Sequence, residues 1–358
     1  MILTRQRLDP TIFDLPLEKM RAGWYTDAYF NHTRAALLEA GRHPQVVMQV
    51  FQKNHAYLGG MDEAIAILKL CAEDFDALTV NALYDGDAIA PYETVMTIEG
   101  DYTTFAHLET VYLGVLARRS LITTNTVNVL RAAGGKPVIF MPARHDHHRV
   151  QTGDGYAAYV AGQVVGATIG VTTDEQASWW GGRGLGTVPH SLIASYGGDT
   201  VAAAKRFAEW APADMNVTVL VDFENDSVRT ALDVAHALGP RLWGVRLDTS
   251  ESLVDRSVWE ELGDFKPTGV NPRLVHKVRD ALDDAGFPEV RIVVSGGFTV
   301  DKIREFEADG VPVDAYGIGS SLIRGSNDFT ADIVVTDGVP SAKVGRHLRP
   351  NARLEPVA

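Results

Sequence analysis

The chain has 358 residues, of which 46% are hydrophobic and 22% charged, a composition typical of a globular protein with a sizeable core. Its formal net charge of −13 argues against nucleic acid or an anionic membrane as the main partner, although a local basic pocket could still hold a small anionic substrate. No apolar run is long enough to span a bilayer, and the single cysteine, Cys71, excludes a disulfide framework or a cysteine-based zinc site. We therefore expect a cytoplasmic protein that acts on small molecules, with Cys71 as a core thiol.

The first third of the chain mixes helix and strand patterns. Hydrophobic periodicity predicts helices at residues 33–40, 61–73 and 105–121, and strands at residues 45–51 and 94–99. We expect residues 1–118 to form a smaller α+β sandwich domain, completed by the C-terminal tail, residues 328–358.

From residue 119 onward, apolar β-branched runs alternate regularly with amphipathic helices. The expected strands are residues 137–141, 166–171, 216–222, 242–248, 290–295 and 314–319, and the clearest helices are 200–210, 226–238, 271–285 and 299–308. The runs at 219–221 and 292–294 are continuously apolar, as in parallel strands that are covered on both faces. This pattern predicts an irregular β/α barrel over residues 119–327, with a doubly wound sheet as the alternative.

Charged residues stand at the carboxyl ends of two neighbouring predicted strands. Arg246 and Asp248 are two positions apart, so their side chains point the same way, and Asp222 ends the strand before them. A guanidinium with two carboxylates suits a ribose, or a sugar carbon that acquires positive charge in its transition state. A purely structural Arg–Asp pair is the alternative.

Two glycine-rich loops follow the last two predicted strands. They contain Ser295, Gly296 and Gly297 in one case and Gly317, Gly319 and Ser320 in the other. Backbone amides at such loops can hold a phosphate, because glycine lets the backbone approach the anion. Ordinary turn glycines are the alternative.

Residues 186–191 place Thr187, His190 and Ser191 between a glycine-rich approach and the start of a helix. The imidazole of His190 could carry a proton or accept a phosphoryl group, whereas a plain helix cap would leave it without a role. The run from Arg144 to Arg149 contains three histidines. We interpret it as a basic loop for a carboxylate or phosphate rather than a metal site, and we predict no metal-ligating residue.

In this order the motifs resemble the nicotinate phosphoribosyltransferases, which are type II phosphoribosyltransferases. The resemblance runs from about residue 23 to Lys343 and is most specific at G-T-x-x-H-S, residues 186–191, and at G-V-R-L-D, residues 244–248. It implies a barrel-like domain with a smaller sandwich domain. It also implies the formation of nicotinate mononucleotide and pyrophosphate from nicotinate and phosphoribosyl pyrophosphate, as a step of NAD biosynthesis. Mg²⁺ would be required, and ATP hydrolysis would be coupled in a ligase-like manner through a transiently phosphorylated histidine.

The resemblance also implies roles for individual residues. The catalytic residues would be His190 as phosphoryl acceptor, with Asp222 and Asp248 holding ribose and magnesium pyrophosphate and stabilising the sugar cation. The substrate-binding residues would be Tyr29, Arg144, Thr187, Ser191, Arg246 and Thr249, and the 5′-phosphate would lie on Ser295–Gly297 and Gly317–Ser320. Tyr29 would stack on the pyridine ring from a partner subunit, which implies a homodimer.

The sequence departs from the family around the base pocket. Met141-Pro142-Ala143-Arg144 stands where relatives often have Phe-Gly-x-Arg, and Thr249-Ser250-Glu251 where they have Ser-Gly-Asp. A quinolinate or nicotinamide phosphoribosyltransferase, or a non-catalytic sensor of phosphate ligands, is therefore an alternative. A metal-dependent hydrolase that uses the His145–His148 cluster is a further one.

Overall fold

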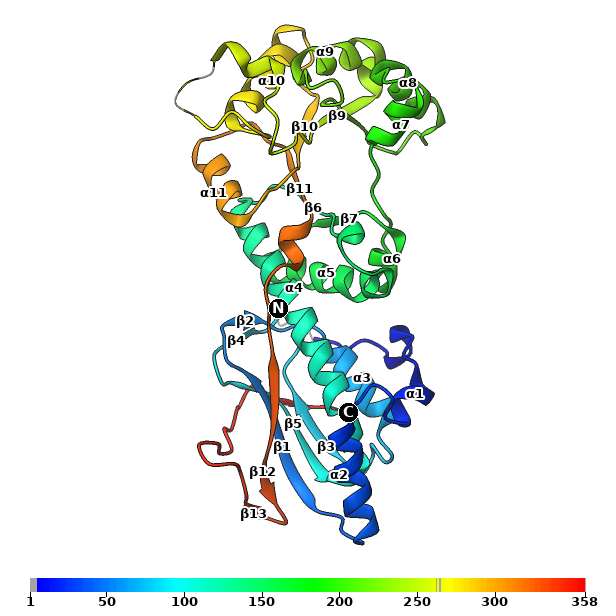
Figure 1. Ribbon diagram of the computed structural model, residues 1–358, viewed down its shortest axis with the longest axis vertical. Helices are drawn as coiled ribbons and strands as arrows, with labels where there is room; N and C mark the ends of the chain where they lie inside the picture. Colours follow the sequence, from blue (N-terminus) through cyan, green and yellow to red (C-terminus); the bar gives the residue numbers. More distant parts are fainter. Residues whose placement is uncertain (1–4, 262, 264, 358) are drawn as a thin grey trace. The chain divides into compact units, whose positions relative to one another are not determined.

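The computed structural model describes residues 5–261, 263 and 265–357, and the chain forms two compact units (Figure 1). Unit 1 comprises Met1–Val127, Tyr156–Val164 and Gly325–Ala358, and unit 2 comprises Asn128–Gly155 and Val165–Arg324. The domain limits expected from the sequence, 1–118 with 328–358 and 119–327, stay a prediction.

Unit 1 is built on an antiparallel sheet in the order β13-β12-β1-β5-β3-β14. Its strands are β1 (Gln45–Gln52), β3 (Thr79–Ala82), β5 (Thr94–Asp101), β12 (Phe329–Thr336), β13 (Val339–Pro340) and β14 (Glu355–Pro356). A separate ribbon pairs β2 (Ala56–Tyr57) with β4 (Ala88–Ile89). The C-terminal tail enters the sheet twice, because β12 pairs with β1 and β14 with β3.

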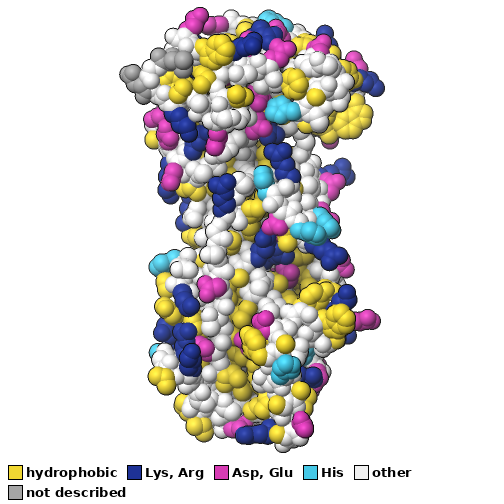
Figure 2. All heavy atoms as spheres, in the orientation of Figure 1, with side chains coloured by type: hydrophobic (Ala, Val, Ile, Leu, Met, Phe, Trp, Pro, Cys, Tyr) yellow, Lys and Arg dark blue, Asp and Glu magenta, His cyan; other side chains and the backbone are white. Residues whose placement is uncertain are grey.

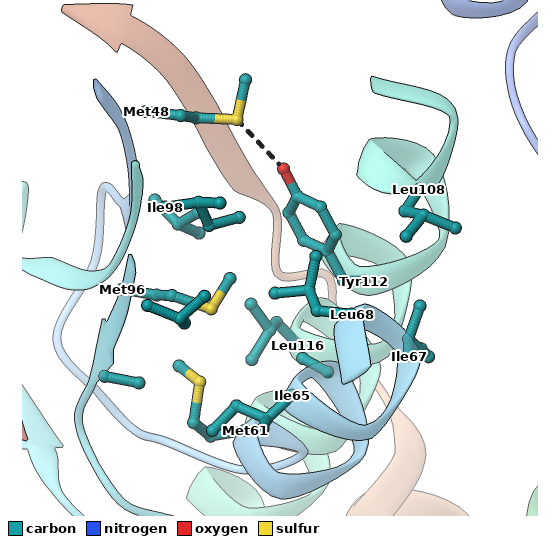
Figure 3. Packing of buried hydrophobic residues seen from close by; sticks show 14 of the residues in the cluster. Met48, Met61, Ile65, Ile67, Leu68, Met96, Ile98, Leu108, Tyr112 and Leu116 are labelled. Atoms are coloured by element: carbon teal, nitrogen blue, oxygen red, sulfur yellow. Dashed lines mark hydrogen bonds between the residues drawn. The ribbon is translucent and has the colours of Figure 1, made fainter. Parts of the chain in front are cut away.

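The helices of this unit are α1 (Leu17–Arg21), α2 (Ala28–Glu39), α3 (Met61–Cys71) and the first part of α4 (Glu109–Ala132). Figure 3 shows the core, in which Met48 and Ile98 from the sheet face Leu68 of α3 and Tyr112 of α4. The Tyr112 hydroxyl donates to Met48 Sδ at 3.2 Å, so this buried phenol has an acceptor. Cys71 is buried, as predicted.

Unit 2 contains a parallel sheet in the order β7-β6-β11-β10-β9-β8. Its strands are β6 (Val138–Phe140), β7 (Ile169–Val171), β8 (Val217–Leu220), β9 (Leu242–Leu247), β10 (Arg291–Val294) and β11 (Ala315–Ile318). Strands β8 to β11 are neighbours in chain order, and β6 follows β11. A doubly wound sheet would instead reverse its order at the middle.

The edges of this sheet are linked by residues 184–188. Leu185 N donates to Val171 O at 2.7 Å, and Val188 N donates to Thr218 O at 2.8 Å, so the segment bridges β7 and β8 in parallel register. It acts as a short irregular strand between the two edges. The predicted fold class, an irregular β/α barrel with a smaller α+β unit, is therefore confirmed.

The helices of unit 2 are α5 (Gln151–Val165, whose C-terminal part belongs to unit 1), α6 (Asp174–Ala177), α7 (His190–Ser195), α8 (Thr200–Trp210), α9 (Ser227–Leu238), α10 (Pro272–Asp284) and α11 (Val300–Ala308). Side-chain caps define several starts: Asp199 accepts from Ala202 N, and Thr299 accepts from Lys302 N. The helix expected at 33–40 starts instead at Ala28. The one expected at 105–121 runs from Glu109 to Ala132, since 3₁₀ helices occupy Tyr102–Thr104 and Ala106–Leu108.

Acidic and basic side chains are interspersed over the visible face, so the negative net charge is not gathered into one field there (Figure 2). In the part of the chain that the structure describes, no helix is both long and apolar enough to cross a membrane.

Candidate active site

A pocket of about 620 Å³ lies in unit 2, at the carboxyl ends of the barrel strands. For each strand of the parallel sheet, a residue within the strand or just after its carboxyl end lines the pocket. Residues 189–191, which follow the irregular strand, line it as well. The pocket brings together most of the predicted site residues: Arg144, His190, Ser191, Arg246, Asp248, Ser295, Gly296, Gly297, Gly317, Gly319 and Ser320.

Arg246, Asp248 and Ser295 form a connected floor. The Ser295 hydroxyl donates to Asp248 Oδ1 at 2.7 Å and accepts from Arg246 Nε at 2.8 Å, and Arg246 Nη2 lies 3.4 Å from Asp248 Oδ2. Ser295 is buried, and its amide donates to Leu247 O. Its hydroxyl therefore orients the two charged groups, and direct phosphate binding by this residue stays a prediction.

His190 is held by the carboxylate that ends the neighbouring strand. Its Nε2 lies 3.1 Å from Asp222 Oδ1, and the Asp222 side chain is 7% exposed whereas that of His190 is 43% exposed. This hydrogen bond raises the pKa of His190, with a smaller contribution from the Asp248 charge, while burial and Arg246 act the other way. Asp222 thus sets the orientation and proton affinity of a pocket-facing imidazole.

The first glycine loop, after β10, has open backbone donors. Gly296 and Gly297 have φ of 82° and 70°, in the left-handed region that favours glycine. Among the hydrogen bonds of the described residues, none is donated by the amide of either glycine. The loop leads into α11 and its Thr299 cap, so unused amides and a helix N-terminus meet at the pocket.

The second glycine loop, after β11, is lined by side chains. A Cβ on Gly317 would lie 2.9 Å from Met141 Sδ, and one on Gly319 would lie 2.8 Å from His145 Cε1. Here glycine leaves room for Met141 and His145, and so brings the histidine ring into the pocket beside Ser320.

Four predicted residues do not line the pocket, and one of them is Asp222, which is described above. Thr187 is half-buried, and Thr249 is buried with an Oγ1 that has no hydrogen-bond partner. Tyr29 belongs to α2 in unit 1, is 59% exposed and has its ring 4.4 Å from that of Phe30. Its stacking on a ligand from a partner subunit stays a prediction.

Other residues on the pocket were not identified as site residues from the sequence. They are Met141, Thr172, Glu251, Phe298, Thr299, Ser321 and Arg324, among others. For Thr172, Ser321 and Arg324 a signal was present, because each closely follows a strand of the predicted barrel. Within the described residues no group of three or more His, Cys, Asp and Glu side chains is arranged to hold a metal ion. The rings of His147 and His148 are tilted by 33° to each other, with their centroids 4.2 Å apart.

Residues 27–120 match the model of the quinolinate phosphoribosyl transferase N-terminal domain. A crystal structure of nicotinate-nucleotide pyrophosphorylase from Pyrococcus furiosus is similar to 96% of this chain and 85% of its own, with a TM-score of 0.80 and 32% identity. The chain belongs to the nicotinate phosphoribosyltransferase family of type II phosphoribosyltransferases.

A curated member of the family, nicotinate phosphoribosyltransferase pncB1 of Mycobacterium tuberculosis (strain CDC 1551 / Oshkosh), is 30% identical over 273 residues. That match covers 74% of this chain and 55% of the relative, so the chain spans about half the length of the curated relatives it matches. Human nicotinic acid phosphoribosyltransferase has the same fold, with a TM-score of 0.63 at 18% identity over 88% of this chain and 75% of its own.

Proposed function

We propose that this protein is a nicotinate phosphoribosyltransferase that forms nicotinate mononucleotide and pyrophosphate from nicotinate and phosphoribosyl pyrophosphate. The observation that carries the proposal is the Arg246–Ser295–Asp248 floor between two glycine loops and the His190–Asp222 pair, all at one end of the barrel. The curated relatives with this name support the choice of base.

The reaction requires a site that stabilises separated charge. The pyridine nitrogen forms a bond to C1′ of the ribose while the C1′–O bond to pyrophosphate breaks, and the pyrophosphate leaves with the electron pair. Asp248 is oriented by the Ser295 hydroxyl and is placed to stabilise positive charge that develops on the sugar. Arg246 is oriented through its Nε by the same hydroxyl and attracts the departing anion.

Mg²⁺ is part of this proposal. In phosphate sites the ion is usually held by one or two carboxylates together with substrate oxygens and water. Asp248 offers such a carboxylate on the pocket lining, close to the Gly296 loop, so the donor chemistry fits. Asp248 would hold the ion, which when bound would neutralise charge on the pyrophosphate.

ATP coupling through His190 is the second part of the proposal. With Nε2–H donating to Asp222, the lone pair of the ring lies on Nδ1, and no hydrogen bond of the described residues uses that atom. Nδ1 could attack the γ-phosphorus of ATP, forming an N–P bond while the bond to ADP breaks. Asp222 would stabilise the charged ring during this transfer.

The test uses the purified full chain with Mg²⁺ and phosphoribosyl pyrophosphate. Nicotinate, nicotinamide and quinolinate are supplied separately, with and without ATP, and products are separated by chromatography. We expect nicotinate mononucleotide and pyrophosphate, with more product when ATP is present. No mononucleotide from any base would refute the proposal, and product from quinolinate with release of CO₂ would favour the quinolinate alternative.

A variant pair separates the role of His190 from general effects. With γ-labelled ATP we expect acid-labile label on the wild type and none on His190→Ala, which should also lose the stimulation by ATP. His276→Ala, an exposed histidine on α10, is the matched control and should keep both. Label that persists on His190→Ala would refute the phosphoryl-acceptor role.

A further inference from the structure

The first glycine loop is in contact with a carboxylate of the protein itself. A Cβ on Gly297 would overlap the Oε1 of Glu251, so this oxygen lies directly against the glycine backbone. Glu251 follows β9 by a few residues, lines the same pocket and is exposed. Its side chain is therefore free to rotate away, while in this structure its charge lies at the loop.

A carboxylate and a phosphate require the same surroundings. Both accept hydrogen bonds from backbone amides and both are favoured at a helix N-terminus. The amides of Gly296 and Gly297 donate to no acceptor among the described residues, and α11 begins three residues after Gly297. An anion that enters this loop must therefore displace the Glu251 carboxylate or bind beside a like charge.

A cation near the loop could attract the Glu251 carboxylate once it is displaced. Lys302 on α11 is half-buried, with its Nζ 4.4 Å from the centroid of the Phe298 ring. Burial lowers the pKa of Lys302, and the charge of Glu251 partly opposes this effect. The two groups thus interact in the present arrangement, and Glu251 can move off Gly297 without losing a positive neighbour.

We propose that Glu251 competes with the substrate phosphate for the Gly296–Gly297 loop and thereby sets the affinity of the pocket for phosphate groups. The identity of that phosphate as part of phosphoribosyl pyrophosphate rests on the function proposed above. Glu251 keeps free inorganic phosphate from filling the loop, because a small anion has few other contacts with which to offset the displacement. A substrate that is also held at its ribose and pyrophosphate displaces it.

The experiment is calorimetric titration of inorganic phosphate into the full chain at pH 7.5 without divalent cations. Glu251→Gln keeps the shape of the side chain and removes the charge, so the Kd for phosphate should fall about tenfold. Glu251→Asp keeps the charge and should stay within about twofold of the wild type. Glu260→Gln removes the same charge from an exposed position outside the pocket and should leave the Kd for phosphate unchanged.

The outcomes separate this inference from the proposed reaction. Unchanged or weaker phosphate binding by Glu251→Gln overturns the inference, as does an equal gain in Glu251→Asp or Glu260→Gln, or no phosphate binding by any of the proteins. If Glu251→Gln binds phosphate more tightly but no mononucleotide is formed from any base, the proposed function fails and the inference stands. If mononucleotide is formed, Glu251→Gln should also lower KM for phosphoribosyl pyrophosphate, and an unchanged KM would overturn the inference alone.

Discussion

Glu109, the first residue of α4, is a buried carboxyl group whose titration should be visible in the stability of unit 1. It is 8% exposed, and burial raises its pKa to about 8, with further contributions from the charges of Asp332 and Asp27. A carboxyl group with a higher pKa in the folded chain than in the unfolded chain stabilises the fold fully at low pH. This stability is lost as the pH rises through the folded pKa.

The expected loss of stability follows from the pH interval between the unfolded and the folded pKa of Glu109. Each pH unit between the unfolded and folded pKa values corresponds to about 1.4 kcal/mol. From pH 5 to pH 8 the wild type should therefore lose about 4 kcal/mol that Glu109→Gln, which cannot titrate, does not lose. The loss should level off above pH 8, where the folded carboxyl group is already ionised.

Urea unfolding of the two proteins at pH 5 to 9 measures this difference, and taking the difference cancels the other titrating groups. Hydrogen exchange of the β1 amides reports unit 1 separately from unit 2. Glu99→Gln makes the same substitution at an exposed position of β5 and should run parallel to the wild type. A difference between wild type and Glu109→Gln that stays constant within about 1 kcal/mol across this range would refute the reasoning.

Two further predictions concern unit 2. Asp222→Asn replaces the carboxylate that raises the pKa of His190 with a neutral amide, so the ring should titrate at lower pH in an NMR titration; an unshifted curve would show that the Asp222 charge does not control this proton. Gly155→Ala would place a Cβ against the Gln176 carbonyl and should destabilise the unit by about 2 kcal/mol in urea. Its control, Gly114→Ala on α4, has open space and should stabilise by up to about 1 kcal/mol; equal effects of the two substitutions would contradict the packing argument.

The barrel could be predicted because its strands carry a strong local signal. Continuous apolar runs at residues 219–221 and 292–294 identify buried parallel strands, and the residues that directly follow these runs are Asp222 and Ser295. Residues 184–188 gave no such signal, since a glycine-rich segment with only two bridges has no apolar period. Pairing of His190 with Asp222 depends on that segment, and it was not predicted from the sequence.

Glu251 shows why the rest of the pocket could not be predicted. The residue lies beyond the strand in an irregular loop, and local sequence patterns do not determine where such a loop returns. Its contact with Gly297 joins two loops that are 46 positions apart. The same reasoning applies to Gly319, where the absence of a side chain leaves room for His145.

The pairing of β12 with β1 has a consequence for the order in which the protein forms during synthesis. All residues of unit 2 are synthesised after β1, β3 and β5 of unit 1 and before Phe329. The whole barrel sequence therefore leaves the ribosome before β12, the partner strand of β1, has been made. During that interval one edge of β1 is unpaired and able to associate with other chains. We expect nascent chains that end before β12 to need chaperones, and this dependence to disappear once the last strands of the sheet are made.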